Sequence, residues 1–93
     1  PVHWALDDAP LYRHVRGASN AIADPDRVVA MWRREFDALH REGGCFVLTM
    51  HPWLSGRAGR VAALAELIEH MRDTPGVWFA TAEEVARWTA GAV

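Results

Sequence analysis

The fold of this chain depends on residues 43–60, GGCFVLTMHPWLSGRAGR. Two glycines open the stretch, and an apolar run from Cys45 to Met50 follows, interrupted only by Thr49. A short apolar run bounded by glycine and proline is typical of a strand that is buried on both faces. The run ends at His51-Pro52. The stretch therefore predicts a buried strand that delivers a histidine at its end, followed by a Gly/Ser-rich turn.

A helix is predicted before this strand. Asp24 can cap its first turn, and Pro25 suits the first helical position. Apolar residues then recur at steps of four, four and three, which places them on one face: Val28, Trp32, Phe36 and Leu39. The glycines at 43 and 44 end the helix.

Two more helices and one more strand are predicted after residue 55. Ser55 can cap a helix whose apolar residues follow the helical period: Val61, Leu64, Ala65, Ile68 and Met71. Residues 74–76, Thr-Pro-Gly, predict a type II turn that leads into a short strand at 77–80. Thr81 and Glu84 have the capping-box spacing, so a third helix is expected to follow them.

The first 23 residues supply one further strand and an irregular connection. Residues 1–6, PVHWAL, predict a strand that places Asp7 and Asp8 at its end. Residues 9–23 show no sustained period, and we expect only one helical turn there, near residues 11–15.

The resulting order, βαβαβα apart from the irregular connection, predicts an α/β fold with parallel strands and helical crossovers. Three such units do not close a barrel, so residues 1–93 are expected to form half of a (β/α) barrel or a small open sheet that must associate. In either case a site would lie at the carboxyl ends of the strands. Asp7, Asp8, His51 and Thr81 all follow predicted strand ends and are candidates for one rim.

Composition narrows the classes of function. The 93 residues suit one small domain or a part of a larger one. The net charge is −2, and arginine supplies all ten basic side chains, scattered among twelve carboxylates, which argues against a nucleic-acid partner. No apolar run of membrane-spanning length and no signal peptide is visible, so a cytoplasmic location is expected. The single cysteine, Cys45, excludes an intrachain disulfide and is expected to be buried.

Three segments carry a resemblance to a known family. PVHWALDDAP, GGCFVLTMHPWLSGRAGR and GVWFATAEEVARW resemble successive C-terminal segments of the polysaccharide deacetylase family. This family has the NodB-homology fold, an irregular (β/α) barrel. The resemblance is closest to the intracellular-looking branch that includes allantoinase-like hydrolases, and it marks residues 1–93 as a C-terminal portion of such a domain.

The resemblance implies hydrolysis of a carbon-nitrogen amide bond that is not a peptide bond, with a divalent metal such as zinc activating water. His51 matches the family's general acid, a task that suits the near-neutral pKa of histidine. Substrate-binding positions are implied at two places, with Trp53 near the rim as a further candidate: Trp4, Asp7 and Asp8 in one segment, and Arg57 and Arg60 in another.

The chain departs from the family where the metal should bind. In the family the metal ligands come from an N-terminal Asp-Asp motif and a His-x-x-x-His motif. Asp7-Asp8 resembles the first motif only superficially, because its context after PVHWA belongs to the later segment, and the second motif is missing. The histidines of this chain, at 3, 14, 40, 51 and 70, include no pair spaced by four. We therefore expect no cofactor site in this chain and no activity from it alone, so that a small-molecule or carbohydrate substrate would bind only with the missing half.

Simpler readings stay open for each candidate. His51 can be a strand-end histidine, Asp7 and Asp8 can be solvated, and Arg57 and Arg60 can be surface or ion-pair residues. Trp32, Trp78 and Trp88 are expected in a core or a barrel interface. For the whole chain, the alternative to part of an amidase is a truncated, inactive α/β module that self-associates as a homo-oligomer.

Overall fold

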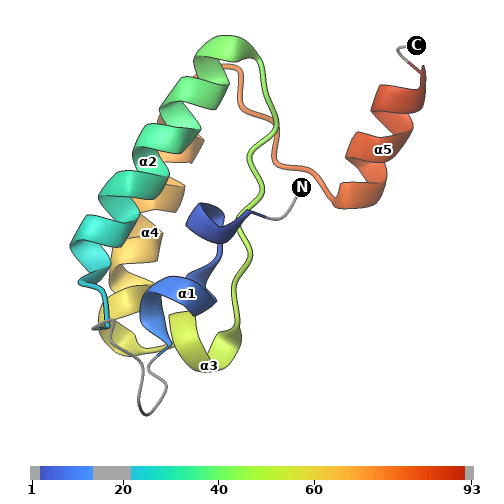
Figure 1. Ribbon diagram of the computed structural model, residues 1–93. Helices are drawn as coiled ribbons and strands as arrows, with labels where there is room; N and C mark the ends of the chain where they lie inside the picture. Colours follow the sequence, from blue (N-terminus) through green and yellow to red (C-terminus); the bar gives the residue numbers. More distant parts are fainter. Residues whose placement is uncertain (1–2, 14–21, 92–93) are drawn as a thin grey trace.

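Two long helices dominate the computed structural model, which describes residues 3–13 and 22–91. The helices α2 and α4 pack side by side, and an extended segment runs along the pair (Figure 1). The short helices α1 and α3 lie at one end of this pair, and α5 lies apart from it (Figure 1). The elements, in order, are η1 (Trp4–Leu6), α1 (Asp8–Tyr12), α2 (Pro25–Glu42), α3 (Pro52–Ser55), α4 (Ala58–Asp73) and α5 (Ala82–Gly91).

Helix α2 confirms the prediction for residues 24–43. The carboxylate of Asp24 accepts the Asp26 N–H at 3.0 Å, and Pro25 occupies the first helical position. Gly43 ends the helix with φ +71°, a left-handed conformation that glycine adopts without a steric cost. The predicted apolar face is buried at Val28, Trp32 and Phe36 and half-buried at Leu39.

Helix α4 differs from its prediction in both start and face. It begins at Ala58, because the short helix α3 takes up Ser55. The buried residues are Ala63, Leu67 and Met71, whereas Val61 and Ile68 are about half exposed. Apolar residues occupy more than one face of α4, so their period alone could not decide which face would pack against α2.

The three predicted strands are wrong for the described residues, which contain no strand. Residues 4–6 close into η1, and residues 1–2 lie outside the description. Residues 45–50 run extended but pair only at one parallel bridge, between Asp7 and Thr49. A strand needs hydrogen-bonded neighbours along its length, and 77–80 have none among the described residues. Residues 3–13 and 22–91 therefore do not show the expected βαβαβα half-barrel.

The C-terminal helix has the predicted cap but buries nothing. Thr81 N–H donates to the Glu84 carboxylate at 2.9 Å, and Glu84 N–H donates to the Thr81 hydroxyl at 3.1 Å, which confirms the capping box. No residue of α5 is buried. Trp78 and Trp88, expected in a core or a barrel interface, are 55% and 67% exposed, and Cys45, expected to be buried, is exposed as well. No helix within the described ranges is long and apolar enough to cross a bilayer.

Helix α1 and η1 are held to α2 by Trp32. Its side chain is 1% exposed, its Nε1–H donates to the Ala5 carbonyl at 2.7 Å, and its ring meets Tyr12 edge-on. Trp32 thus anchors the segment that presents Asp7 and Asp8. Part of the turn expected at 11–15 is present as the end of α1, and residues 14–15 lie outside the description.

Replacing Trp32 by phenylalanine is expected to lower the free energy of unfolding by about 2 kcal/mol, because the Ala5 carbonyl loses its donor and the smaller ring leaves space. Chemical denaturation measures the loss. Trp88→Phe is the matched control and should change stability by less than about 0.5 kcal/mol, because Trp88 is exposed. Equal losses in the two variants would contradict this description of the core.

Candidate functional site

Asp8 and His51 meet although 43 residues separate them. The bridge between Asp7 and Thr49 brings the two segments together: Asp8 N–H donates to the Thr49 carbonyl at 3.0 Å, and Thr49 N–H donates to the Leu6 carbonyl at 2.9 Å. Asp8 then opens α1, and His51 caps α3 two residues after the bridge. The backbone of two short helices therefore fixes both side chains.

The Asp8 carboxylate is fully buried and accepts three hydrogen bonds. One oxygen, Oδ1, lies 2.6 Å from His51 Nδ1. The other, Oδ2, accepts the backbone N–H of His51 at 2.6 Å and the hydroxyl of Ser55 at 2.7 Å. A buried carboxylate is stable as an anion only when donors of this kind surround it.

His51 is held at one ring nitrogen and open at the other. Its side chain is 39% exposed, and Nδ1 is the nitrogen that contacts Asp8. A carboxylate at Nδ1 fixes the proton there, which leaves Nε2 as the nitrogen that can give or take a proton at the surface. This is the arrangement in which a buried aspartate orients a general acid or base.

The pair shifts the pKa values of both partners. The hydrogen bond that His51 donates to the Asp8 carboxylate raises the pKa of His51 above its ordinary 6.5. Burial alone would raise the pKa of Asp8, but the bonds from the His51 side chain, the His51 N–H and Ser55 outweigh burial and lower it below 3.8. The His51 contribution to stability is therefore complete below pH 6.5 and is lost as the pH rises through the raised pKa.

Asp7 lies beside this pair but has a different task. Its Oδ1 accepts the Ala9 N–H at 2.9 Å and thereby caps α1. The same oxygen is 3.9 Å from His51 Nδ1, too far for a hydrogen bond. Asp7 therefore adds negative charge near the imidazole ring without orienting it.

A metal ion is the cofactor that the family resemblance implies, and these three residues are the only described group that offers ligands for one. One ligand atom each from Asp7, Asp8 and His51 lie within 4.8 Å of one another. Those atoms are already engaged: Asp8 accepts three donors, Asp7 accepts the Ala9 N–H, and His51 Nδ1 faces Asp8. The group fits a hydrogen-bonded cluster better than a cation site, since a cation would displace these donors.

The aromatic candidates are placed only in part. Trp53 is 62% exposed, and its ring centroid lies 6.0 Å from that of His51, so it borders the imidazole ring. The backbone of Trp4 lies in η1, and its side chain falls outside the description.

The two arginines point to different surroundings. Arg57 is exposed at the N-cap of α4, and its side chain makes no capping bond. Arg60 turns inward: Nη1 donates to the Leu54 carbonyl at 2.7 Å, and the guanidinium lies 4.4 Å from the centre of the Tyr12 ring. Arg60 thus joins α1, α3 and α4 behind the Asp8–His51 pair.

Arg60→Lys is expected to lower the free energy of unfolding by about 1 to 2 kcal/mol, because an ammonium cannot both reach Leu54 and stack on Tyr12. Thermal or denaturant unfolding measures this loss. Arg57→Lys, three residues away and exposed, should stay within about 0.5 kcal/mol of the wild type. A larger loss in Arg57→Lys than in Arg60→Lys would contradict the assignment.

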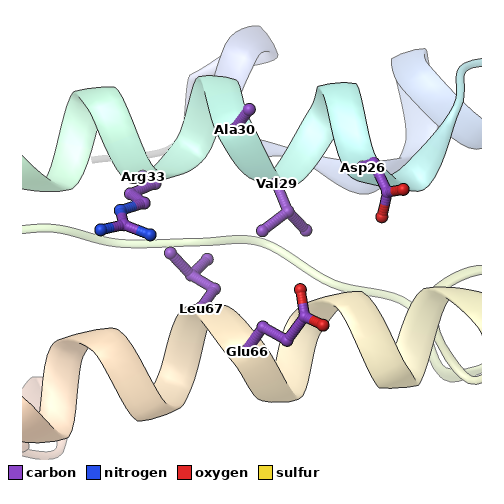
Figure 2. Close-up of a pocket in the computed structure, with 6 residues that line it drawn as sticks. All are labelled: Asp26, Val29, Ala30, Arg33, Glu66 and Leu67. Atoms are coloured by element: carbon purple, nitrogen blue, oxygen red, sulfur yellow. The ribbon is translucent and has the colours of Figure 1, made fainter.

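Two histidine contacts and one groove lie away from this site. His70 Nε2 lies 2.6 Å from Asp37 and joins α4 to α2, and His40 Nε2 lies 2.7 Å from the Pro75 carbonyl. A groove of about 180 Å³ lies between α2 and α4, where Val29 and Leu67 face each other (Figure 2). The groove shares no residue with the Asp8–His51 pair, and its other lining residues are Asp26, Ala30, Arg33 and Glu66.

Sequence reasoning missed Ser55 as part of the site and assigned it to a helix cap. The available signal was its spacing: Ser55 follows His51 by four residues across a proline-initiated turn, which places both on one side of a helical turn. Tyr12 was missed as the aromatic partner of Arg60 because nothing local in the sequence links residues 12 and 60.

Comparisons with known proteins agree on one kind of enzyme. A Helicobacter pylori protein named "Peptidoglycan deacetylase" is 31% identical over 90 residues, which cover 92% of this chain and 31% of the relative. A Schizosaccharomyces pombe protein named "Putative polysaccharide deacetylase" is 39% identical over 64 residues, or 62% of this chain and 20% of the relative. No family model matches the chain.

A solved structure is similar over almost the entire chain. It is the crystal structure of a protein titled "putative polysaccharide deacetylase" from Mycobacterium smegmatis, with 39% identity and a TM-score of 0.91, covering 99% of this chain and 33% of that one. The chain therefore spans about a third or less of the length of these proteins. In both sequence and structure, the chain is similar to part of proteins named as deacetylases.

Proposed function

We propose that residues 1–93 are the C-terminal portion of a NodB-type (β/α) barrel, in the allantoinase-like branch, and carry the proton-transfer residues of a hydrolase that cleaves non-peptide carbon-nitrogen amide bonds. The observation that carries the proposal is the buried Asp8 carboxylate bound to Nδ1 of a partly exposed His51. The similarity to proteins named as deacetylases supports this reading of the pair. We also retain the cytoplasmic location as part of the proposal.

In the proposed reaction a water oxygen bonds to the amide carbonyl carbon, the carbon-nitrogen bond breaks, and the products are a carboxylate and an amine. The departing nitrogen requires a proton, which His51 Nε2 supplies as general acid. Asp8 holds the ring in place and stabilises the imidazolium before the proton is transferred. Activation of the water is assigned to groups outside this chain.

Substrate contacts are proposed around the open side of His51. Trp53 borders the ring, and we assign it stacking against a sugar face. We propose that Trp4, Asp7 and Asp8, on the segment of η1 and α1, shape the substrate-binding surface beside His51. Asp8 would act through His51, because Asp8 is fully buried. Arg57 is proposed for anionic substrate groups, and Arg60 for holding the turn that carries His51.

Exposed apolar side chains indicate how the chain would be completed. Val47 and Met50 on the extended segment, and Trp78, Phe79 and Trp88 near the C-terminal end, are all exposed. A similar backbone makes up 33% of a longer solved chain. We propose that the further residues of such a chain cover these positions. The alternative is a self-associating, inactive module, and this surface also favours it.

Acetate release from N-acetylated chito-oligosaccharide and from purified peptidoglycan, by the full protein that carries these residues, tests the proposal. Turnover of either probe is expected, with His51→Gln strongly impaired. Sedimentation of the 93-residue chain tests the alternative. A discrete homo-oligomer, together with no acetate release from the full protein, would favour the self-associating module over the enzyme.

A further inference from the structure

Ser55 is buried, and its side chain contacts Asp8, the acidic member of the pair. It is 7% exposed, and its hydroxyl donates to Asp8 Oδ2 at 2.7 Å. Ser55 is the last residue of α3, whose first turn begins at the His51 cap, and its N–H donates to the His51 carbonyl at 2.9 Å. The first and the last residue of this helical turn, His51 and Ser55, therefore both donate a hydrogen bond to the Asp8 carboxylate.

We propose that Ser55 is a positioning residue, whose hydroxyl fixes the rotation of the Asp8 carboxylate so that Oδ1 points at His51 Nδ1. The inference rests on the proposed function of His51 as a proton donor. Ser55 itself lies behind Asp8 and touches no substrate.

The geometry of the two carboxylate oxygens supports this assignment. Oδ2 accepts the His51 backbone N–H and the Ser55 hydroxyl, and a carboxylate that is held at one oxygen by two donors cannot turn freely. Oδ1 is then directed at the imidazole, 2.6 Å away. Without the hydroxyl, Oδ2 keeps one donor, and the carboxylate can rotate away from the His51 ring.

Loss of the Ser55 hydroxyl would change the properties of His51 rather than those of residue 55. A rotated carboxylate no longer holds the proton at Nδ1, so the ring can change tautomer and turn. The pKa of His51, which the Asp8 hydrogen bond raises, would then fall toward 6.5. Small displacements of a catalytic group are costly, and we expect kcat to fall on the order of tenfold.

Imidazole nitrogen NMR of the full protein tests the inference without any assay of activity. Ser55→Ala is expected to weaken the downfield signal of the Nδ1 proton, to mix the two tautomers and to lower the titration midpoint of His51. Ser55→Thr keeps the hydroxyl and should restore all three. If Ser55→Ala does not fold, Ser55→Cys, which keeps the shape with a weaker donor, replaces it.

Thr74→Val is the matched control. The Thr74 hydroxyl donates to the His70 carbonyl at 2.6 Å, away from the pair, so its removal should leave the His51 signals unchanged. Two results in Ser55→Ala would overturn the inference. Unchanged His51 signals would mean that Ser55 is only structural. A raised His51 midpoint would mean that the Ser55 hydroxyl only weakens the negative charge of Asp8. If the His51 signals respond but neither the wild type nor any variant releases acetate, the positioning role stands and the proposed function fails.

Discussion

Replacing His51 by glutamine is expected to lower the rate of amide hydrolysis by about two to four orders of magnitude, the range that general acid catalysis contributes. In this variant Asp8 keeps the backbone N–H of residue 51 and the Ser55 hydroxyl as donors, but a glutamine amide cannot deliver a proton to a departing amine. The side chain of His51 is partly exposed, and the fold should therefore survive the substitution. Acetate release measured at saturating probe gives kcat.

His70→Gln is the matched control for this prediction. His70 also faces an aspartate at 2.6 Å, but its pair joins α4 to α2 and is separate from the Asp8–His51 site. We expect its rate to stay within about threefold of the wild type, because it touches no reacting group. Equal losses in the two variants would mean that histidine–aspartate pairs matter here only for the fold.

Replacing Asp8 by alanine is expected to lower the free energy of unfolding by about 2 to 4 kcal/mol, because a buried carboxylate that accepts three hydrogen bonds is removed. The substitution leaves the His51 N–H and the Ser55 hydroxyl without an acceptor inside the fold. It also removes a side chain that is 0% exposed. Denaturant unfolding of the chain measures the change.

Asp73→Ala serves as the control for Asp8. Asp73 is exposed at the end of α4, and its ion pair is with the adjacent Arg72, so removal should change stability by less than about 0.5 kcal/mol. A loss below about 1 kcal/mol in Asp8→Ala would contradict the assignment of Asp8 as the buried acceptor that organises α1 and α3.

Local signals were sufficient where the helix depends on its own residues. The bounds of α2 followed from Asp24, Pro25 and Gly43, because capping and glycine conformation act within one turn. The strand predictions were wrong for the opposite reason. Residues 45–50 have the apolar composition of a buried strand, but a strand also needs paired neighbours, which the described residues do not supply beyond one bridge. The face of α4 likewise depended on where α2 lies.

The site was predictable as a set of residues and not as a geometry. Strand-end reasoning and family resemblance selected His51, Asp7 and Asp8. The hydrogen bond between Asp8 and His51 depends on the bridge at Thr49, which joins segments more than 40 residues apart. The contacts of Ser55 with Asp8 and of Arg60 with Tyr12 also join residues more than 40 positions apart in the sequence, so local patterns could not predict them.

The most direct test of the account is the pH dependence of kcat for acetate release by the full protein and by its His51→Gln variant. A general acid must be protonated to act, so the wild-type rate should fall on the alkaline side with a midpoint above 6.5, because Asp8 raises the pKa of His51. The residual activity of His51→Gln should lack this alkaline decrease. If the variant retains the decrease at the same midpoint, another group is the acid and the central claim is wrong.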